Sequence, residues 1–388
     1  MSFPSRKAAI VGVYNSKQAR NLPYASPWQL ELECVQGALA DAGLTHKDVD
    51  GLIPMAFHTP LSLHMQWAEQ LGGRPISFLD VGGGAGAVSK AALAVASGMA
   101  NVVVIWFGNA GVRLGPQGNS VNPSAPRVPD MSYTVQGAYM SPWYAMWTRR
   151  YMHQFNVPAE HLAEYSVIAR HHAVLNEESV MGVKGEITVD DVFNSRMIAD
   201  PLHLLECPLD NDGGYAIVVA SEAVARGCRK TPVWVLGGCE AVYTDPYQSI
   251  TPHWISSEAQ AVRTTADKAF AMAGVSRDDI DTAGLYDCFP VTMARDLEEC
   301  GFCELGEGAE YIHAGHVALG GKMPCNTDGG LLSGSHNGNP SGMQVTEVTK
   351  QLRGECGVRQ VPNAKIGLAL SQGWAVHGLA GTVILARD

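Results

Sequence analysis

Residues 38–50 read ALADAGLTHKDVD, and residues 269–281 read AFAMAGVSRDDID. The two stretches align without a gap from Ala38 and Ala269 onward, at a constant offset of 231 residues. Each predicts the end of a helix, a glycine stop, a polar turn and an aspartate that precedes a strand. The repeat indicates that one α/β unit occurs twice in the chain.

Glycine-rich turns support the same duplication. Residues 82–86 read GGGAG and lead into an expected helix, which Gly98 ends before an expected strand at 102–107. The second half presents the same order: a glycine-containing turn at 338–342 (GNPSG), a helix end at Gly354 and an expected strand at 366–370. Two matches in the same order are better explained by duplication than by chance.

The rest of the pattern predicts an α/β fold, because strands and helices alternate along the chain. Residues 102–107 read VVVIWF, a run short enough for a strand that is buried on both faces. The other expected strands of the first half are 8–14, 50–53 and 76–81, and its expected helices are 28–42, 87–96 and 159–175.

Residues 108–158 break this rhythm with glycine, proline and asparagine, followed by aromatic side chains and methionines. A long segment of this kind inside a compact domain is usually a functional loop. Two interpretations stay open. The apolar side chains form a small separate hydrophobic core under the loop, or they line the binding site of an apolar substrate. The side chains concerned are Met131, Tyr133, Tyr139, Met140, Trp143, Tyr144, Met146, Trp147 and Tyr151.

Composition narrows the function classes. The chain has 388 residues, of which 46% are hydrophobic and 17% charged, so extended disorder is excluded. The net charge of −11 disfavours a nucleic-acid partner, which needs a basic surface. We expect no membrane span and a cytoplasmic location, because no apolar stretch of about 20 residues and no signal-peptide pattern occurs. The nine cysteines follow no disulfide framework and are expected to be reduced thiols.

Three short strings carry a resemblance to a known family: CPLDNDGG at 207–214, YDCF at 286–289 and NTDGGLLS at 326–333. Together with the duplication, they resemble the sterol-carrier and lipid-transfer branch of the thiolase superfamily, from residue 8 to residue 386. The resemblance implies a thiolase fold, which is a duplicated, five-layered αβαβα structure with an inserted loop domain. It places the N-terminal half at 1–107 plus 159–225, the inserted loop domain at 108–158 and the C-terminal half at 226–388.

The chain departs from thiolases where their chemistry resides. A thiolase attacks a thioester with a cysteine at a turn entering a helix, whose N-terminus lowers the pKa of the thiol. That position falls at about Gly83, and no residue from Leu71 to Ala100 is cysteine. The family's Gly-His-Pro motif falls on residues 335–337 (SHN), and its last catalytic loop falls on residues 376–378 (VHG), again without cysteine. A protein without this thiol cannot form the acyl-enzyme.

A glycine-rich turn combined with Tyr-Asp-x-Phe resembles the thiolase-fold aldolases of steroid side-chain breakdown. Those enzymes cleave a β-hydroxyacyl-CoA by a retro-aldol step into a ketone or aldehyde and a shorter acyl-CoA. The resemblance implies no cofactor besides the coenzyme A of the substrate. It also implies a homodimer and a small OB-fold, zinc-ribbon-type partner protein, which together make a heterotetramer. In many of these aldolases a second tyrosine stands where this chain has His336.

Retro-aldol cleavage needs a base for the β-hydroxyl proton and donors for the thioester oxygen as it becomes an enolate. We expect Tyr286 to handle the hydroxyl proton and His336 to donate to the thioester oxygen. His377 is a weaker candidate for protonating the enolate. Further donors at the helix N-terminus are the backbone N–H groups of Gly83, Gly84 and Gly86. The missing side chain at Gly83 is expected to leave room for a branched carbon.

Other functions stay open. An acyltransferase could use a displaced nucleophile such as Cys288, and a lipid-transfer or scaffold subunit could keep the fold without chemistry. The candidate catalytic residues also have ordinary structural interpretations: Tyr286 as a half-buried tyrosine and His336 as a turn residue. Residues 82–87 fit a dinucleotide fingerprint, but residues 105–112 lack the acidic side chain that this fingerprint expects.

A zinc site is the last alternative that the sequence raises, but its ligand spacing is unfavourable and we expect no metal. The central gap between its cysteines and histidines is shorter than in a zinc finger, so plain buried thiols are the preferred interpretation. The side chains concerned are Cys300, Cys303, His313 and His316.

Overall fold

The computed structural model of the chain describes residues 3–55, 61–110, 141–242, 261–337, 341–373 and 378–388. The elements of the first part of the chain are β1 (Ala8–Asn15), α1 (Pro27–Ala42), β2 (Gly51–Pro54), α2 (Leu61–Gln70), β3 (Phe78–Leu79), α3 (Gly84–Ala96), β4 (Val102–Asn109), α5 (Ser141–Phe155), α6 (Ala159–Val174), α7 (Val189–Asn194), β5 (Met197–Ala199), β6 (Leu202–His203), β7 (Gly213–Ser221) and α8 (Glu222–Ala225). Those of the second part are β8 (Val233–Val242), α9 (Ala261–Ala273), β9 (Thr282–Gly284), α10 (Pro290–Glu299), α11 (Gly308–His313), α12 (Ser341–Arg353), β10 (Ile366–Gly373) and β11 (Leu379–Ala386).

The order of the strands shows the duplication. The described residues form one nine-stranded sheet in the order β3-β2-β4-β7-β1-β8-β11-β10-β9. From the centre outward, β1, β7, β4 and β2 on one side correspond to β8, β11, β10 and β9 on the other. The two halves meet where Ala9 pairs with Trp234 and Ile10 pairs with Val233.

The repeated sequence has the same structure in both halves. Gly43 and Gly274 end α1 and α9 with φ angles of 75° and 68°, a left-handed conformation that glycine adopts without strain. Asp50 accepts the backbone N–H at the start of β4 at 2.8 Å, and Asp281 accepts the equivalent N–H at the start of β10 at 2.9 Å. The predicted duplication is therefore confirmed down to individual hydrogen bonds.

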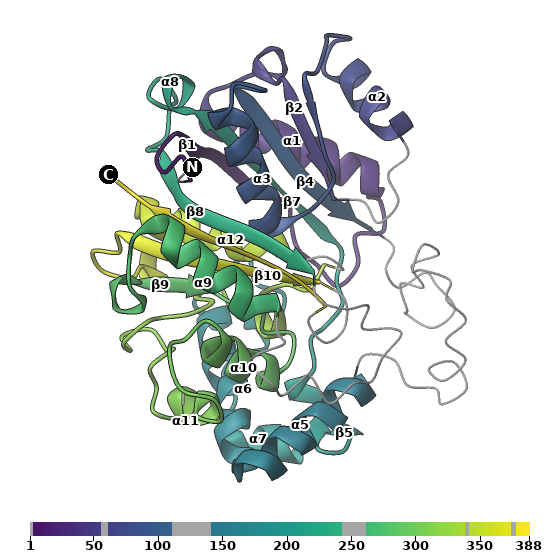
Figure 1. Ribbon diagram of the computed structural model, residues 1–388. Coiled ribbons are helices and arrows are strands. Elements are labelled where there is room, and N and C mark those ends of the chain that lie inside the picture. The colour runs from purple at the N-terminus through teal and green to yellow at the C-terminus, as the bar shows by residue number, and fades with distance from the viewer. Residues whose placement is uncertain (1–2, 56–60, 111–140, 243–260, 338–340, 374–377) are drawn as a thin grey trace.

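The helices lie in three layers that alternate with the two halves of the sheet. α1 packs on β1, β4 and β7, whereas α9 packs on β8 and β11. α3 and α12 each contact strands of both halves, so they form the central layer (Figure 1). α3 is rich in alanine and glycine and is buried on nearly all sides, as a helix between two sheets must be. The predicted five-layered αβαβα fold is confirmed.

Two expected elements have different bounds. The strand expected at 76–81 comprises only Phe78–Leu79. The helix expected to begin at residue 87 already begins at Gly84, because glycines that read as a turn form its first turn.

The segment expected as an inserted loop contains helix α5. α5 contacts α10, and α6 contacts α10 and α11, so both helices join the C-terminal half of the structure (Figure 1). Within α5, the side chains of Trp143, Tyr144, Trp147 and Tyr151 belong to the apolar core of that half. For these four side chains, the core interpretation holds. Met131, Tyr133, Tyr139 and Met140 lie outside the described residues, and the expected domain boundaries stay a prediction.

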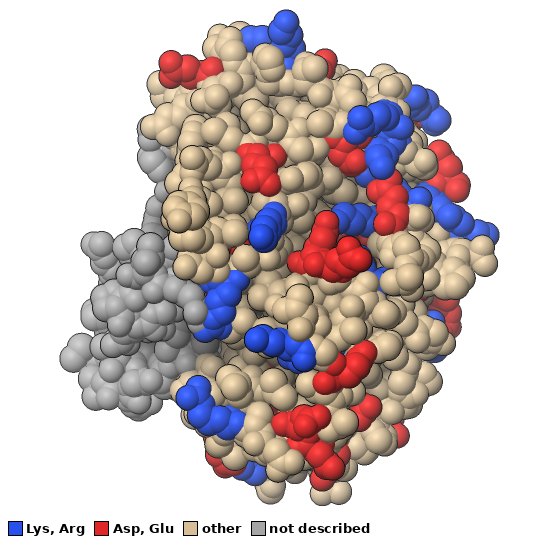
Figure 2. All heavy atoms as spheres, turned by 180° about the vertical axis from the view of Figure 1, so that it is seen from behind, with Lys and Arg blue, Asp and Glu red and all other residues tan. Residues whose placement is uncertain are grey.

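Among the described residues, no helix is both long and apolar enough to cross a membrane. Acidic and basic side chains are interspersed on the face shown in Figure 2.

Candidate active site

The glycine-rich turn between β3 and α3 forms the first part of the site. Gly83 is the N-cap of α3, and Gly84 has a φ angle of 56°. A Cβ atom on Gly84 would lie 2.0 Å from Ser371 Oγ, at the end of β10. Ser371 Oγ accepts a hydrogen bond from the backbone N–H of Ala85 at 2.7 Å. The end of β10 and the N-terminus of α3 are therefore held in contact, and only glycine fits between them.

The position of the missing nucleophile is not an open space. A Cβ atom on Gly83 would lie 2.9 Å from Met55 Sδ and 3.0 Å from Tyr215 Oη. One of the two atoms ends the flexible side chain of Met55, so the expected room for a branched carbon depends on where that side chain lies and stays a prediction. A cysteine at this position would force the Met55 side chain to shift and Tyr215 to give by a few tenths of an ångström.

Gly86 and the turn before it are surrounded by charges. A Cβ atom on Gly86 would lie 2.3 Å from Glu240 Oε1. Lys90 Nζ lies 3.4 Å from Glu240 and 3.3 Å from Asp80, and it donates to the backbone oxygen of Val81 at 2.6 Å. Gly86 thus faces a protein carboxylate, and Lys90 holds the turn that leads to Gly83.

Tyr286 follows β9 and is half-buried. Its backbone N–H donates to Asp296 Oδ2 at 3.0 Å, and Gln372 donates to the other oxygen of this carboxyl group. Gln372 is the neighbour of Ser371, and adjacent strand residues point to opposite faces of a sheet. The end of β10 therefore connects the turn that carries Tyr286 with the N-terminus of α3.

Asp287 joins two of the strings that the sequence singled out. It is fully buried, and it accepts hydrogen bonds from Tyr165 Oη at 2.7 Å and from the backbone N–H of Leu331 at 2.8 Å. Asn326 donates to Tyr165 Oη at 3.0 Å. Burial raises the pKa of Asp287 to about 6, although the hydrogen bonds that it accepts oppose this shift. YDCF and NTDGGLLS thus form one buried polar network, which positions the loop before His336.

His336 is held by the third string. Its backbone N–H donates to Asn211 Oδ1 at 2.6 Å, and its backbone oxygen accepts from the N–H of Asn211 at 3.1 Å. The imidazole is mostly buried, and its Nδ1 lies 3.2 Å from Asp210 Oδ1. Nδ1 forms no hydrogen bond of good geometry with a described residue, so the contact with Asp210 is electrostatic rather than a hydrogen bond that orients the ring.

Buried amide groups support the same loop. Gln18 Oε1 accepts hydrogen bonds from Ser335 Oγ at 2.8 Å and from Asn337 Nδ2 at 3.3 Å. Asn109, the last residue of β4, donates to the backbone oxygen of Asn337 at 3.2 Å. The loop that contains His336 is therefore attached to the first half of the structure, next to the ends of β1 and β4.

The structure thus connects the predicted turns that carry Gly83, Tyr286 and His336 through the ends of β4 and β10. His377 lies outside the described residues. Sequence reasoning assigned no role to Asp210, Asp296 or Tyr215. Asp210 stands inside a string that was recognised, whereas Asp296 and Tyr215 occur in ordinary helix and strand patterns.

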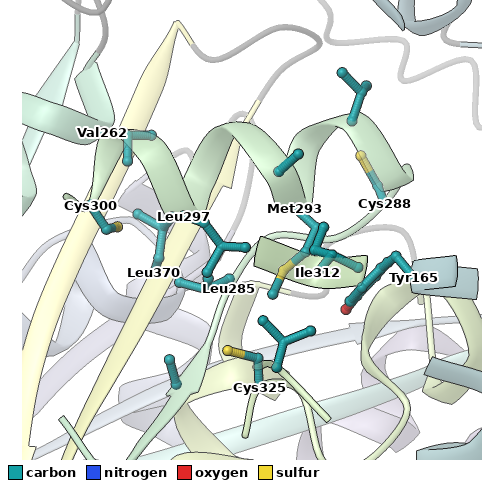
Figure 3. Packing of buried hydrophobic residues seen from close by; sticks show 14 of the residues in the cluster. Tyr165, Val262, Leu285, Cys288, Met293, Leu297, Cys300, Ile312, Cys325 and Leu370 are labelled. Atoms are coloured by element: carbon teal, nitrogen blue, oxygen red, sulfur yellow. The ribbon is translucent and has the colours of Figure 1, made fainter. Parts of the chain in front are cut away.

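The cysteines provide no reactive thiol among the described residues. All nine are free, and Cys288, Cys300 and Cys325 lie among apolar side chains (Figure 3). Burial raises the pKa of each of these three thiols. A thiol of this kind stays protonated near neutral pH and is a poor nucleophile.

The residues weighed as a zinc site have other neighbours. His313 stacks on His161 with ring centroids 4.1 Å apart, and His316 packs against Tyr311. Cys300 is fully buried. Within the described ranges, no group of three or more histidine, cysteine, aspartate or glutamate side chains is arranged to hold a metal ion.

Comparisons with known proteins agree with this geometry. Residues 248–387 match the family described as Thiolase C-terminal domain-like. The steroid side-chain-cleaving aldolase of Thermomonospora curvata is 34% identical over 91% of this chain and 92% of its own length. The 17-hydroxy-3-oxo-4-pregnene-20-carboxyl-CoA lyase of Mycobacterium tuberculosis is 34% identical over 90% of this chain and 92% of its length.

Solved structures show the same relationship. The Ltp2-ChsH2(DUF35) aldolase superimposes with a TM-score of 0.84 at 31% identity, covering 100% of this chain and 99% of the other. Human mitochondrial 3-ketoacyl-CoA thiolase, at 14% identity, shares the fold with a TM-score of 0.66 over 99% of both chains. The prediction of a carbon–carbon lyase of the aldolase type is confirmed. The chain belongs to the thiolase superfamily, in the branch that contains the steroid side-chain-cleaving aldolases.

Proposed function

We propose that this protein cleaves a β-hydroxyacyl-CoA thioester with a steroid side chain by a retro-aldol reaction. The products are a ketone or aldehyde and a shorter acyl-CoA. The names of the two relatives support a steroid CoA thioester as substrate. The observation that carries the proposal is that the turn entering α3 has glycine in place of a thiol, while the buried contact of Asp287 with Leu331 joins the loops that carry Tyr286 and His336.

In the proposed reaction, Tyr286 takes up the proton of the β-hydroxyl group while its own phenolic proton passes to a relay, from which it returns to the product. The oxygen–hydrogen electron pair becomes the new carbonyl bond, and the Cα–Cβ bond breaks. Its electrons pass into the thioester as an enolate. His336 and the backbone N–H groups at the start of α3 hold the enolate oxygen, because preorganised donors stabilise developing charge. A proton then returns to Cα, for which His377 is our candidate.

This reaction needs no covalent bond to the enzyme, so the loss of the cysteine is compatible with catalysis. The competing acyltransferase function would need a displaced nucleophile such as Cys288. That side chain is 2% exposed, and burial raises the pKa of its thiol. The observations therefore favour lyase chemistry over acyl transfer.

A direct test incubates the purified protein with β-hydroxyacyl-CoA thioesters of steroid side chains and identifies the products by mass spectrometry. We expect equal amounts of a carbonyl product and a shortened acyl-CoA. A reactive acyl-CoA analogue provides the second arm. Its attachment to Cys288 would support the acyltransferase, whereas binding without cleavage or labelling would support a lipid-transfer subunit.

We also propose a homodimer that binds a small partner subunit with an OB fold and a zinc ribbon. The pairing of Ltp2 with ChsH2 in the solved aldolase supports a partner. β3 lies at an edge of the sheet, and Leu79 and Val81 there are 44% and 40% exposed, which supports pairing between two copies. Light scattering after size exclusion tests this. A mass of one chain would contradict the dimer, and no mass increase with a DUF35 protein would contradict the partner.

A further inference from the structure

Tyr215 on β7 is a buried tyrosine that the mechanism above does not use. Its side chain is 0% exposed, and its ring lies 6.1 Å from the ring of Phe107. At the start of α12, a Cβ atom on Gly342 would lie 2.0 Å from a ring carbon of Tyr215. The ring is therefore clamped between β4 and α12, and its hydroxyl group has a fixed position.

The hydroxyl group points to the place of the missing nucleophile. Tyr215 Oη lies 3.0 Å from the position of a Cβ atom on Gly83. The backbone N–H groups of Gly84 and Gly342 are close enough to oppose the rise in pKa that burial causes. No described residue forms a hydrogen bond of good geometry with this oxygen, so its proton has no acceptor among them. A buried hydroxyl group whose proton has no acceptor is rare and calls for an explanation.

Two helices direct their N-termini to the same place. α3 and α12 each have 13 residues, and both begin beside Tyr215. The first N–H groups of a helix have no partner within the helix and favour negative charge. An oxygen that becomes an enolate would be stabilised here, and the phenol would add a further donor.

We propose that Tyr215 is a further catalytic residue, whose hydroxyl group donates to the thioester oxygen as the enolate forms. The inference rests on the proposed retro-aldol reaction. Tyr215 forms no covalent bond and keeps its proton, while the electrons of the Cα–Cβ bond pass into the enolate. Met55 Sδ covers the same place from a half-buried, flexible side chain, so Met55 is the residue that moves to admit the thioester.

Tyr215→Phe tests the proposal because it removes only the hydroxyl group. We expect kcat to fall about 10²-fold and KM to rise by up to about tenfold, because the hydroxyl group also binds the thioester oxygen of the bound substrate. The urea midpoint of unfolding should change little, because the hydroxyl group forms no hydrogen bond of good geometry with a described residue. A kcat within about threefold of the wild-type value would overturn the catalytic role.

Tyr151→Phe is a matched control. Tyr151 is equally buried, but its hydroxyl group donates to Glu298 in the core of the C-terminal half. This variant should lower the urea midpoint and leave kcat unchanged, the reverse of the pattern for Tyr215→Phe. If Tyr215→Phe instead behaves like Tyr151→Phe, the hydroxyl group is structural and the inference is wrong.

A binding measurement separates this inference from the proposed function. The wild-type protein should bind a saturated acyl-CoA thioester about tenfold more tightly than the thioether analogue without the carbonyl oxygen, and Tyr215→Phe should lose this preference. An unchanged preference in the variant would overturn the inference. A preference that depends on Tyr215, in a protein that cleaves no β-hydroxyacyl-CoA, would support the donor and refute the retro-aldol function.

Discussion

Substituting Gly84 by alanine tests the contact between the start of α3 and the end of β10. The new Cβ atom would lie 2.0 Å from Ser371 Oγ and 2.4 Å from the backbone oxygen of Ser341. Ser371 would have to release the N–H of Ala85, which leaves that N–H unpaired and costs about 1–3 kcal/mol. The left-handed backbone adds about 1 kcal/mol and overpacking about 1–3 kcal/mol. We expect Gly84→Ala to lose about 3–7 kcal/mol of unfolding free energy.

Gly98→Ala at the other end of α3 is the matched control. Gly98 has a φ angle of 79°, and an added Cβ atom would meet nothing within 4 Å. This variant should lose only the backbone contribution, about 1 kcal/mol. Urea denaturation of both variants measures the difference, and product formation measures kcat. If Gly84→Ala is as stable as Gly98→Ala and has the wild-type kcat, the turn is not part of a tightly built catalytic site.

Three further predictions concern single side chains. Tyr286→Phe should lower kcat about 10²–10⁴-fold, and near-normal turnover would remove Tyr286 from the mechanism. Asp210→Asn should lower kcat about tenfold because His336 loses the negative charge beside its Nδ1, whereas Glu186→Gln, beside an exposed histidine, should not; equal kcat values would contradict this role. Burial lowers the pKa of His172 from 6.5 to about 4, so the stability that depends on its neutral form is complete above pH 6.5 and declines by about 3 kcal/mol as the pH falls to 4. His172→Gln should flatten the dependence of unfolding free energy on pH in this range, and an unchanged slope would refute the assignment.

The features that the sequence predicted correctly recur in both copies of the repeat. The glycine stops at Gly43 and Gly274 end their own helices, whereas Asp50 and Asp281 stand at the same place of the repeat and accept from strands 52 and 85 residues further along. Their spacing therefore survives in the sequence. The helix start at Gly84 was missed because glycine usually marks a turn, whereas here the approach of Ser371 requires it.

Long-range packing could not be predicted in the same way. α5 and α6 follow the first half in the chain, but their buried aromatic side chains complete the core of the second half. No local pattern states which of two similar sheets a helix covers. The segment at 141–155 falls within the predicted loop because glycine, proline and asparagine open that stretch at residue 108, and its helix is visible only in the structure.

The candidate site was predicted in part. Tyr286 and His336 were found because they stand in recognised strings, yet nothing in those strings states which residues hold them. Asp296 contacts Tyr286 from a helix ten residues away, and Tyr215 reaches Gly83 from a separate strand. Such contacts depend on the folded chain, so only the structure reveals them.

The central claim is that a carbon–carbon bond breaks here without a covalent enzyme intermediate. The most direct measurement is the intact mass of the protein, quenched during turnover of a β-hydroxyacyl-CoA, together with the masses of the products. We predict an unmodified protein mass at every time point while the carbonyl product and the shorter acyl-CoA accumulate. An acyl group attached to any cysteine at a rate that matches turnover would contradict the account.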